Sequence, residues 1–89
     1  MRRAIITVVG MDAVGIIAAV SSYLRDRKIN ILDISQTITG GFFHMMMIVD
    51  ITTVADFVNV VEDLDKLGES IGVEIHCQRE EIFTDMHRV

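Results

Sequence analysis

Residues 30–52 read NILDISQTITGGFFHMMMIVDIT, which is two strand-like runs separated by two glycines. Gly40 and Gly41 can take the positive φ angles that tight hairpin turns require. In the second run one face is wholly apolar (Phe43, Met45, Met47, Val49, Ile51) and the other half apolar (Phe42, Met46, Ile48). The segment therefore predicts a β-hairpin, and it predicts that the half-apolar face of the second strand is covered by something else.

The segments on both sides of this hairpin each pair a strand with a helix. Residues 4–9 are β-branched and apolar, which is typical of a central strand, and from Val14 apolar residues recur at helical spacing. Residues 55–71 show helical spacing again, and residues 73–77 alternate as a strand does. The order β-α-β-β-α-β predicts an α+β, ferredoxin-like sandwich, a four-stranded antiparallel sheet with both helices on one face.

The same patterns predict which side chains face the core. In the first helix they are Ile16, Val20, Tyr23 and Leu24, and in the second Phe57, Val58, Val61, Leu64 and Ile71. In the second helix Glu62, Asp63, Asp65 and Lys66 are expected to face water, and in the first hairpin strand Leu32, Ile34 and Ile38 share a face.

Residues 1–79 form the predicted domain, and residues 80–89 are predicted to be a short amphipathic tail helix. Its apolar residues are Ile82, Phe83, Met86 and Val89, between Glu80–Glu81 and His87–Arg88. Acidic residues first and basic residues last suit the helix dipole. A helix this short is unstable alone in water, so we expect it to dock on the exposed sheet face or on a partner subunit.

The composition limits the possible partners. Of 89 residues, 51% are hydrophobic and the net charge is −5. That apolar content exceeds what a small monomer needs, which favours a homodimer or a higher homo-oligomer. An acidic domain repels phosphate groups, so we expect no nucleic acid and no membrane as partner. A single cysteine and the lack of a long apolar stretch indicate a cytoplasmic protein.

A search for catalytic or metal chemistry finds little. Cys77 has no CxxC neighbour and is predicted to be a buried core thiol. His44, His76 and His87 lack the spacing of metal ligands, and the side chain of Met46 points away from those of its two methionine neighbours. Without a nucleophile motif or a paired acid and base, the sequence predicts no enzyme, no cofactor and no metal site.

The loop after the first strand is the remaining candidate. Gly10 permits a tight turn, and Gly15, at the start of the helix, lets a ligand or another backbone come close. Backbone N–H groups of residues 14–16 suit a carboxylate. An equally good interpretation is a helix capped by Asp12, with Gly15 serving helix–sheet packing.

At this loop the sequence resembles a known family. Residues 12–20, DAVGIIAAV, and residues 30–36, NILDISQ, are similar to the ACT domain, and the resemblance covers residues 3–79. Agreement is closest with a subgroup of small stand-alone bacterial and archaeal ACT proteins of uncharacterised function. The resemblance implies paired domains and a small ligand, often an amino acid. The positions that would contact it are Asp12, Val14, Gly15, Ile16, Asn30 and Ile31.

Two positions depart from the family's pattern. Ala13 stands where a lysine or arginine is common, which removes one possible ligand contact, and Lys28 stands where a glycine usually ends the first helix. The sequence thus predicts a regulatory homodimer that binds a small molecule, an amino acid for preference. The alternative is a ligand-free dimerisation or protein-interaction module.

Overall fold

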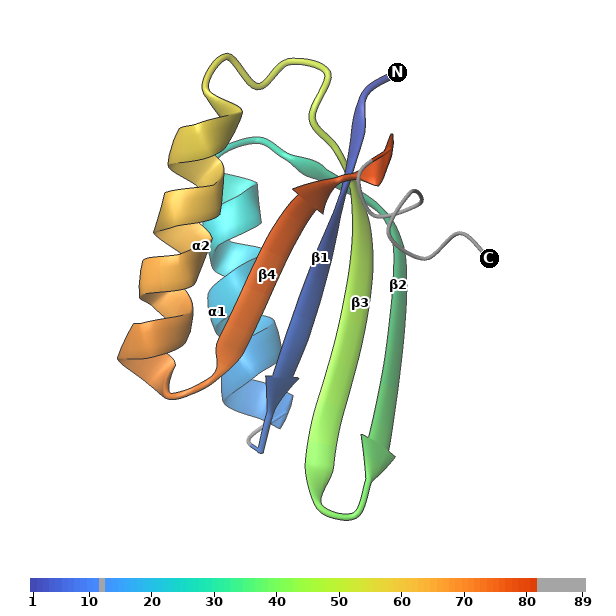
Figure 1. Ribbon diagram of the computed structural model, residues 1–89, viewed down its shortest axis with the longest axis vertical. Coiled ribbons are helices and arrows are strands. Elements are labelled where there is room, and N and C mark those ends of the chain that lie inside the picture. The colour runs from blue at the N-terminus through green and yellow to red at the C-terminus, as the bar shows by residue number, and fades with distance from the viewer. Residues whose placement is uncertain (12, 82–89) are drawn as a thin grey trace.

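The computed structural model describes residues 1–11 and 13–81. The elements are β1 (Arg3–Gly10), α1 (Ala13–Asp26), β2 (Asn30–Thr39), β3 (Phe42–Asp50), α2 (Phe57–Ile71) and β4 (Glu74–Arg79). The strands form one antiparallel sheet in the order β2-β3-β1-β4, and both helices cover the same face (Figure 1). The predicted α+β βαββαβ architecture is confirmed.

The predicted tail helix falls almost wholly outside the described residues. Glu80 and Glu81 begin a helical turn after β4, and residues 82–89 are not described. Glu80 forms a bidentate ion pair with Arg3 of β1, which fixes the chain at this point to the end of the sheet where β1 begins. The boundary between domain and tail stays a prediction.

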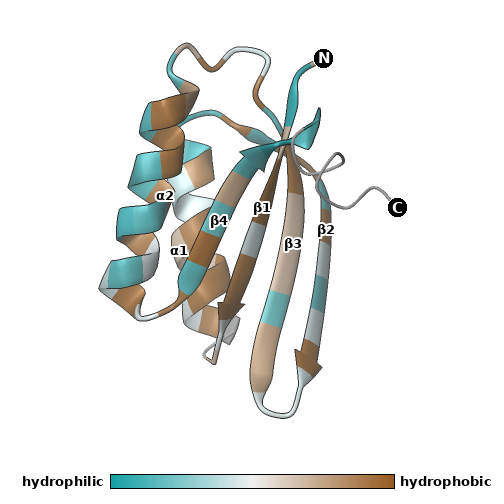
Figure 2. Ribbon diagram, viewed as in Figure 1, coloured by the Kyte–Doolittle hydropathy of each residue, from teal (hydrophilic) through white to brown (hydrophobic). Residues whose placement is uncertain are grey.

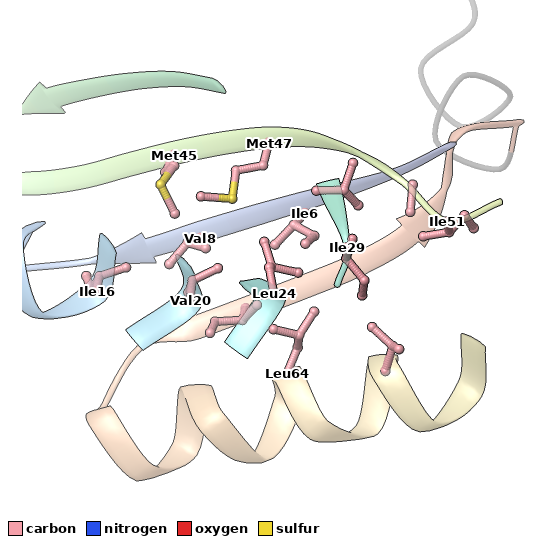
Figure 3. Packing of buried hydrophobic residues seen from close by; sticks show 14 of the residues in the cluster. Ile6, Val8, Ile16, Val20, Leu24, Ile29, Met45, Met47, Ile51 and Leu64 are labelled. Atoms are coloured by element: carbon pink, nitrogen blue, oxygen red, sulfur yellow. The ribbon is translucent and has the colours of Figure 1, made fainter. Parts of the chain in front are cut away.

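The core lies between the sheet and the helices (Figure 3). Every second residue of β1 and β3 faces the helices and is buried: Ala4, Ile6 and Val8 in β1, and Phe43, Met45, Met47 and Val49 in β3. The predicted face of α1 is confirmed, because Ile16, Val20 and Leu24 are at most 2% exposed. Each such side chain contributes about 1.5–3 kcal/mol by leaving water, which makes this layer the main source of stability.

The predicted inner face of α2 is partly wrong. Val58 and Ile71 are 62% and 38% exposed, whereas the buried residues are Val60, Leu64 and Gly68. The reason is close packing at Gly68, where a Cβ would lie 2.8 Å from the carbonyl oxygen of Val73. Because α2 can approach β4 this closely only through a glycine, Gly68 faces the sheet. Leu64 and Val60, four and eight residues earlier, lie on the same side of the helix and are buried with it.

Both helices end in the same backbone motif. After α1, the N–H of Ile29 donates to the carbonyl of Leu24 at 2.9 Å, and the N–H of Lys28 to that of Arg25 at 3.0 Å. These are the two bonds of a Schellman motif, and the buried Ile29 supplies its apolar contact. The motif requires one residue with a left-handed backbone conformation. After α2 that residue is Gly72 (φ 76°), whereas after α1 it is Lys28 (φ 58°).

Strand β2 forms an exposed edge of the sheet. An irregularity between Ile31 and Asp33 interrupts its alternation, and beyond it Ile34 pairs with Met47 and Ile38 with Phe43. Ile34 and Ile38 therefore belong to the helix-facing side of the sheet, yet they are 44% and 70% exposed. On the open face Phe42 and Met46 are also exposed, so residues 1–11 and 13–81 do not by themselves cover the apolar residues of this sheet.

Lys28→Gly should stabilise the fold. A side chain in the left-handed region costs about 1–2 kcal/mol, and part of the gain is lost to the greater freedom of glycine in the unfolded chain. We expect a net gain of about 1 kcal/mol, which raises Tm by about 4–8 °C in a domain of this size. Thermal unfolding followed by circular dichroism measures it. Lys28→Ala is the matched control, because it removes the same charge but keeps the Cβ; an equal gain in both variants would refute the backbone explanation.

Candidate functional site

The loop between β1 and α1 brings several predicted site residues to one end of the sheet. Val14 is 80% exposed and Gly15 is exposed, both in the first turn of α1. Asp12 lies outside the described residues. The turn therefore presents backbone and small groups to the surroundings, next to the positive end of the α1 dipole.

Ile16 belongs to the core and not to the surface. It is 2% exposed, and its Cδ1 would lie 2.7 Å from a Cβ placed on Gly10. The same imaginary Cβ would lie 2.4 Å from Cγ1 of Val73. Gly10 is thus the point where β1, α1 and the start of β4 pack against one another, and the side chain of Ile16 anchors the loop from below.

Asn30 and Ile31 lie at the other end of the sheet. Asn30 opens β2 and pairs with Asp50, which in turn pairs with Arg3 at the start of β1. The loop follows Gly10, at the far end of β1, so the two sets of residues are about 24 Å apart at about 3.4 Å per residue. The described members of the predicted site therefore lie in two separate groups, the predicted half-sites, at opposite ends of the sheet.

The loop end of the sheet also contains a shallow hollow of about 440 Å³. Apolar walls come from Val9, Met11, Phe42 and Val73, and the charged residues that line it are Glu69 and Glu74. Met11 immediately precedes the loop residue Asp12, so the hollow adjoins the candidate ligand loop.

A polar cluster joins α1 to α2, and sequence reasoning missed it. Asp63, expected to face water, accepts hydrogen bonds from the Tyr23 hydroxyl at 2.8 Å and from Arg27 Nη2 at 2.5 Å. Burial, followed by the hydrogen bond to Asp63, raises the pKa of Tyr23 to about 12. Asn59 of α2 also donates to Asp63 at 3.4 Å, and the cluster ties α1 to α2. The sequence carries no signal for it, because the partners are 36 and 40 residues apart.

The histidine, cysteine and acidic side chains of the described residues lie apart from one another. Residues 1–11 and 13–81 contain no group of three histidine, cysteine or acidic side chains that could hold a metal ion. Cys77 packs against the core, and burial raises the pKa of its thiol to about 12. At neutral pH this thiol is protonated and a poor nucleophile. Neither α1 nor α2, the two helices of the described residues, has the combination of length and apolar content that a membrane-spanning helix needs.

Comparison with known proteins gives one consistent result. Residues 2–78 match the ACT domain family model. A UPF0237 protein of Bifidobacterium longum is 60% identical over 90 residues, which cover 100% of both chains. The structure of an ACT domain protein from Streptococcus pneumoniae is similar with a TM-score of 0.82 at 39% identity, over 92% of this chain and 93% of that one.

A more distant likeness concerns the fold alone. A formyltetrahydrofolate deformylase from Pseudomonas syringae matches with a TM-score of 0.79 at 23% identity. The match covers 89% of this chain but only 28% of that one. The same sandwich therefore also occurs as one part of a larger protein.

Proposed function

Since the chain belongs to the ACT domain family, within the UPF0237 group of small stand-alone proteins, we propose that it is a cytoplasmic regulatory module that binds an amino acid as a homodimer. The observation that carries the proposal is the division of the site residues between the two ends of a sheet with an exposed edge. No catalytic step is part of this function.

The first half-site suits a carboxylate. An anion near the start of a helix gains about 0.3–1 kcal/mol from the dipole, and each hydrogen bond to the backbone adds about 1 kcal/mol. Gly15 is exposed and has no side chain, so a small ligand can come close to the first turn of α1. The second half-site adds Asn30, an exposed side chain that both donates and accepts hydrogen bonds.

Pairing of two copies through β2 can join the half-sites. An exposed edge strand presents unpaired N–H and C=O groups, and twofold symmetry makes two such strands antiparallel. Asn30 of the second copy then lies beside Thr39 of the first. Because Thr39 pairs with Phe42, and Gly10 pairs with Phe43, this is the end of the sheet where the loop lies. The second copy can thus supply the Asn30 side chain at the loop, whereas the first copy's own Asn30 is about 24 Å from that loop.

The exposed apolar residues of β2 favour this edge as the contact. Leu32, Ile34 and Ile38 are 39%, 44% and 70% exposed, and Ile34 and Ile38 are on the helix-facing side. A second copy would place its own helix layer against them and remove this surface from water. The same contact would serve a ligand-free dimerisation module, so ligand binding is what separates the two functions.

At least one standard L-amino acid should stabilise the full chain. A ligand present at about 100 times its Kd adds about 2.7 kcal/mol, which differential scanning of an amino-acid panel detects. For the amino acid with the largest shift, Gly15→Val and Asn30→Ala should each weaken binding about 10-fold, through blocked approach and through a lost hydrogen bond to a charged group. Calorimetric titration gives the affinities, with Val58→Ala on the exposed side of α2 as the control. A panel without any shift would leave only the dimerisation function.

Ile38→Lys should separate the copies without unfolding them. Lysine on an edge strand opposes pairing with another strand, and Ile38 is 70% exposed, so its replacement costs one subunit little. Sedimentation velocity should report a dimer for the wild type and a monomer for Ile38→Lys. Val58→Lys, at a position of similar exposure (62%) away from β2, should stay a dimer. A dimeric Ile38→Lys variant would show that β2 is not the contact.

A further inference from the structure

The exposed apolar side chains concentrate at one end of the molecule. Six of the eleven exposed large hydrophobic residues in the described part of the chain lie at the end of the sheet that contains the loop: Val9, Met11, Val14, Ile38, Phe42 and Ile71. In Figure 2 the arrowheads of β1 and β2 are brown at this end, whereas the arrowhead of β4 and the N-terminal segment at the opposite end are teal. The apolar surface is therefore localised, which is typical of binding sites and not of ordinary protein surface.

The register explains how this end forms the hollow of about 440 Å³. Val9 pairs with His44, so Phe42, two residues before His44, is diagonal to Val9 on the same face of the sheet. On the other side Val9 pairs with Glu74 of β4. The hollow lies among these residues and Met11, and its volume falls in the range of small-molecule sites.

The base of the hollow is closed by close packing. A Cβ on Gly10 would lie 2.4 Å from Cγ1 of Val73, and one on Gly68 would lie 2.8 Å from the Val73 carbonyl oxygen. Backbone and side chains therefore fill the space beneath, and a ligand can enter only from the surface. The open side adjoins Met11 and the loop, where the proposed function places the ligand's carboxylate.

We infer that this hollow binds the side chain of the ligand and selects amino acids with an apolar side chain of the size of leucine, methionine or phenylalanine. The inference rests on the proposed function and adds its substrate class. Apolar walls favour the binding of an apolar side chain, since each CH₂ group that is buried contributes about 0.8 kcal/mol to the binding free energy. Glu69 and Glu74 attract the ligand's ammonium group and repel an acidic side chain. Small polar amino acids leave the walls uncovered, and acidic ones face two carboxylates.

The test is calorimetric titration of the full chain with L-leucine, L-methionine, L-phenylalanine, glycine, L-serine and L-aspartate. The apolar amino acids should bind at least about 10-fold more tightly than glycine and serine, the discrimination expected of an apolar pocket. Phe42→Ala should weaken leucine binding by about 10-fold and leave serine binding within about 2-fold of its value. Glu74→Gln should reduce the difference in affinity between aspartate and leucine, because it removes one of the two carboxylates that repel aspartate. Val58→Ala is the control, and circular dichroism confirms that each variant is folded.

The possible outcomes distinguish the two proposals. Serine or glycine binding as tightly as leucine, or a Phe42→Ala variant with unchanged leucine affinity, would overturn the apolar selection and leave the proposed function intact. Binding of none of the six amino acids, together with none in the wider panel, would overturn both proposals and make a protein partner the occupant of this apolar end.

Discussion

The antiparallel register of β1 with both of its neighbours is the constraint on which the rest of the structure depends. With β1 antiparallel to β3 and β4, and β2 antiparallel to β3, each helix must carry the chain back along the full length of the sheet before the next strand can begin. The loop after Gly10 and the start of β2 at Asn30 are therefore at opposite ends, however the helices are packed. The same return path places the loop, the β2–β3 turn and the end of α2 together at one end. The division of the half-sites and the apolar hollow thus have one origin.

The sequence predicts the parts of the fold that depend on local periodicity. Alternation in residues 42–52 predicted the buried side of β3, and the spacing of Ile16, Val20 and Leu24 predicted the buried face of α1, because a side chain's direction follows from its place in a helix or strand. The rotation of α2 could not be predicted, since it is set by the close approach of Gly68 to Val73 from another element. The sequence predicts that Asp63 faces water, and this is also wrong because of contacts with another element: its partners Tyr23 and Arg27 belong to α1.

The candidate site shows the same limit. The resemblance selected loop residues and Asn30 by their sequence positions, which contain no information about the distance between them. In the structure Val14 and Gly15 are exposed in the first turn of α1, Ile16 is a core residue, and Asn30 is at the far end of the sheet. Residues Val9, Met11 and Phe42 could not be grouped from the sequence, because only the pairing of β1 with β3 brings them together. The exposed edge at β2 then indicates how two incomplete halves can make one site.

The central claim is that one binding site takes its loop from one copy and Asn30 from another, and mixing two variants with weakened binding tests it most directly. Gly15→Val has a blocked loop and an intact Asn30, whereas Asn30→Ala has the reverse. In a mixed dimer one of the two sites then combines a normal loop with a normal Asn30. If the two variants are unfolded together and refolded in equal amounts, random pairing in a twofold dimer should restore about a quarter of the wild-type sites. Calorimetric titration with the amino acid that stabilises the wild type most should show those sites at wild-type affinity. A mixture that binds no better than the separate variants would mean that each chain holds its own complete site, and would contradict the account.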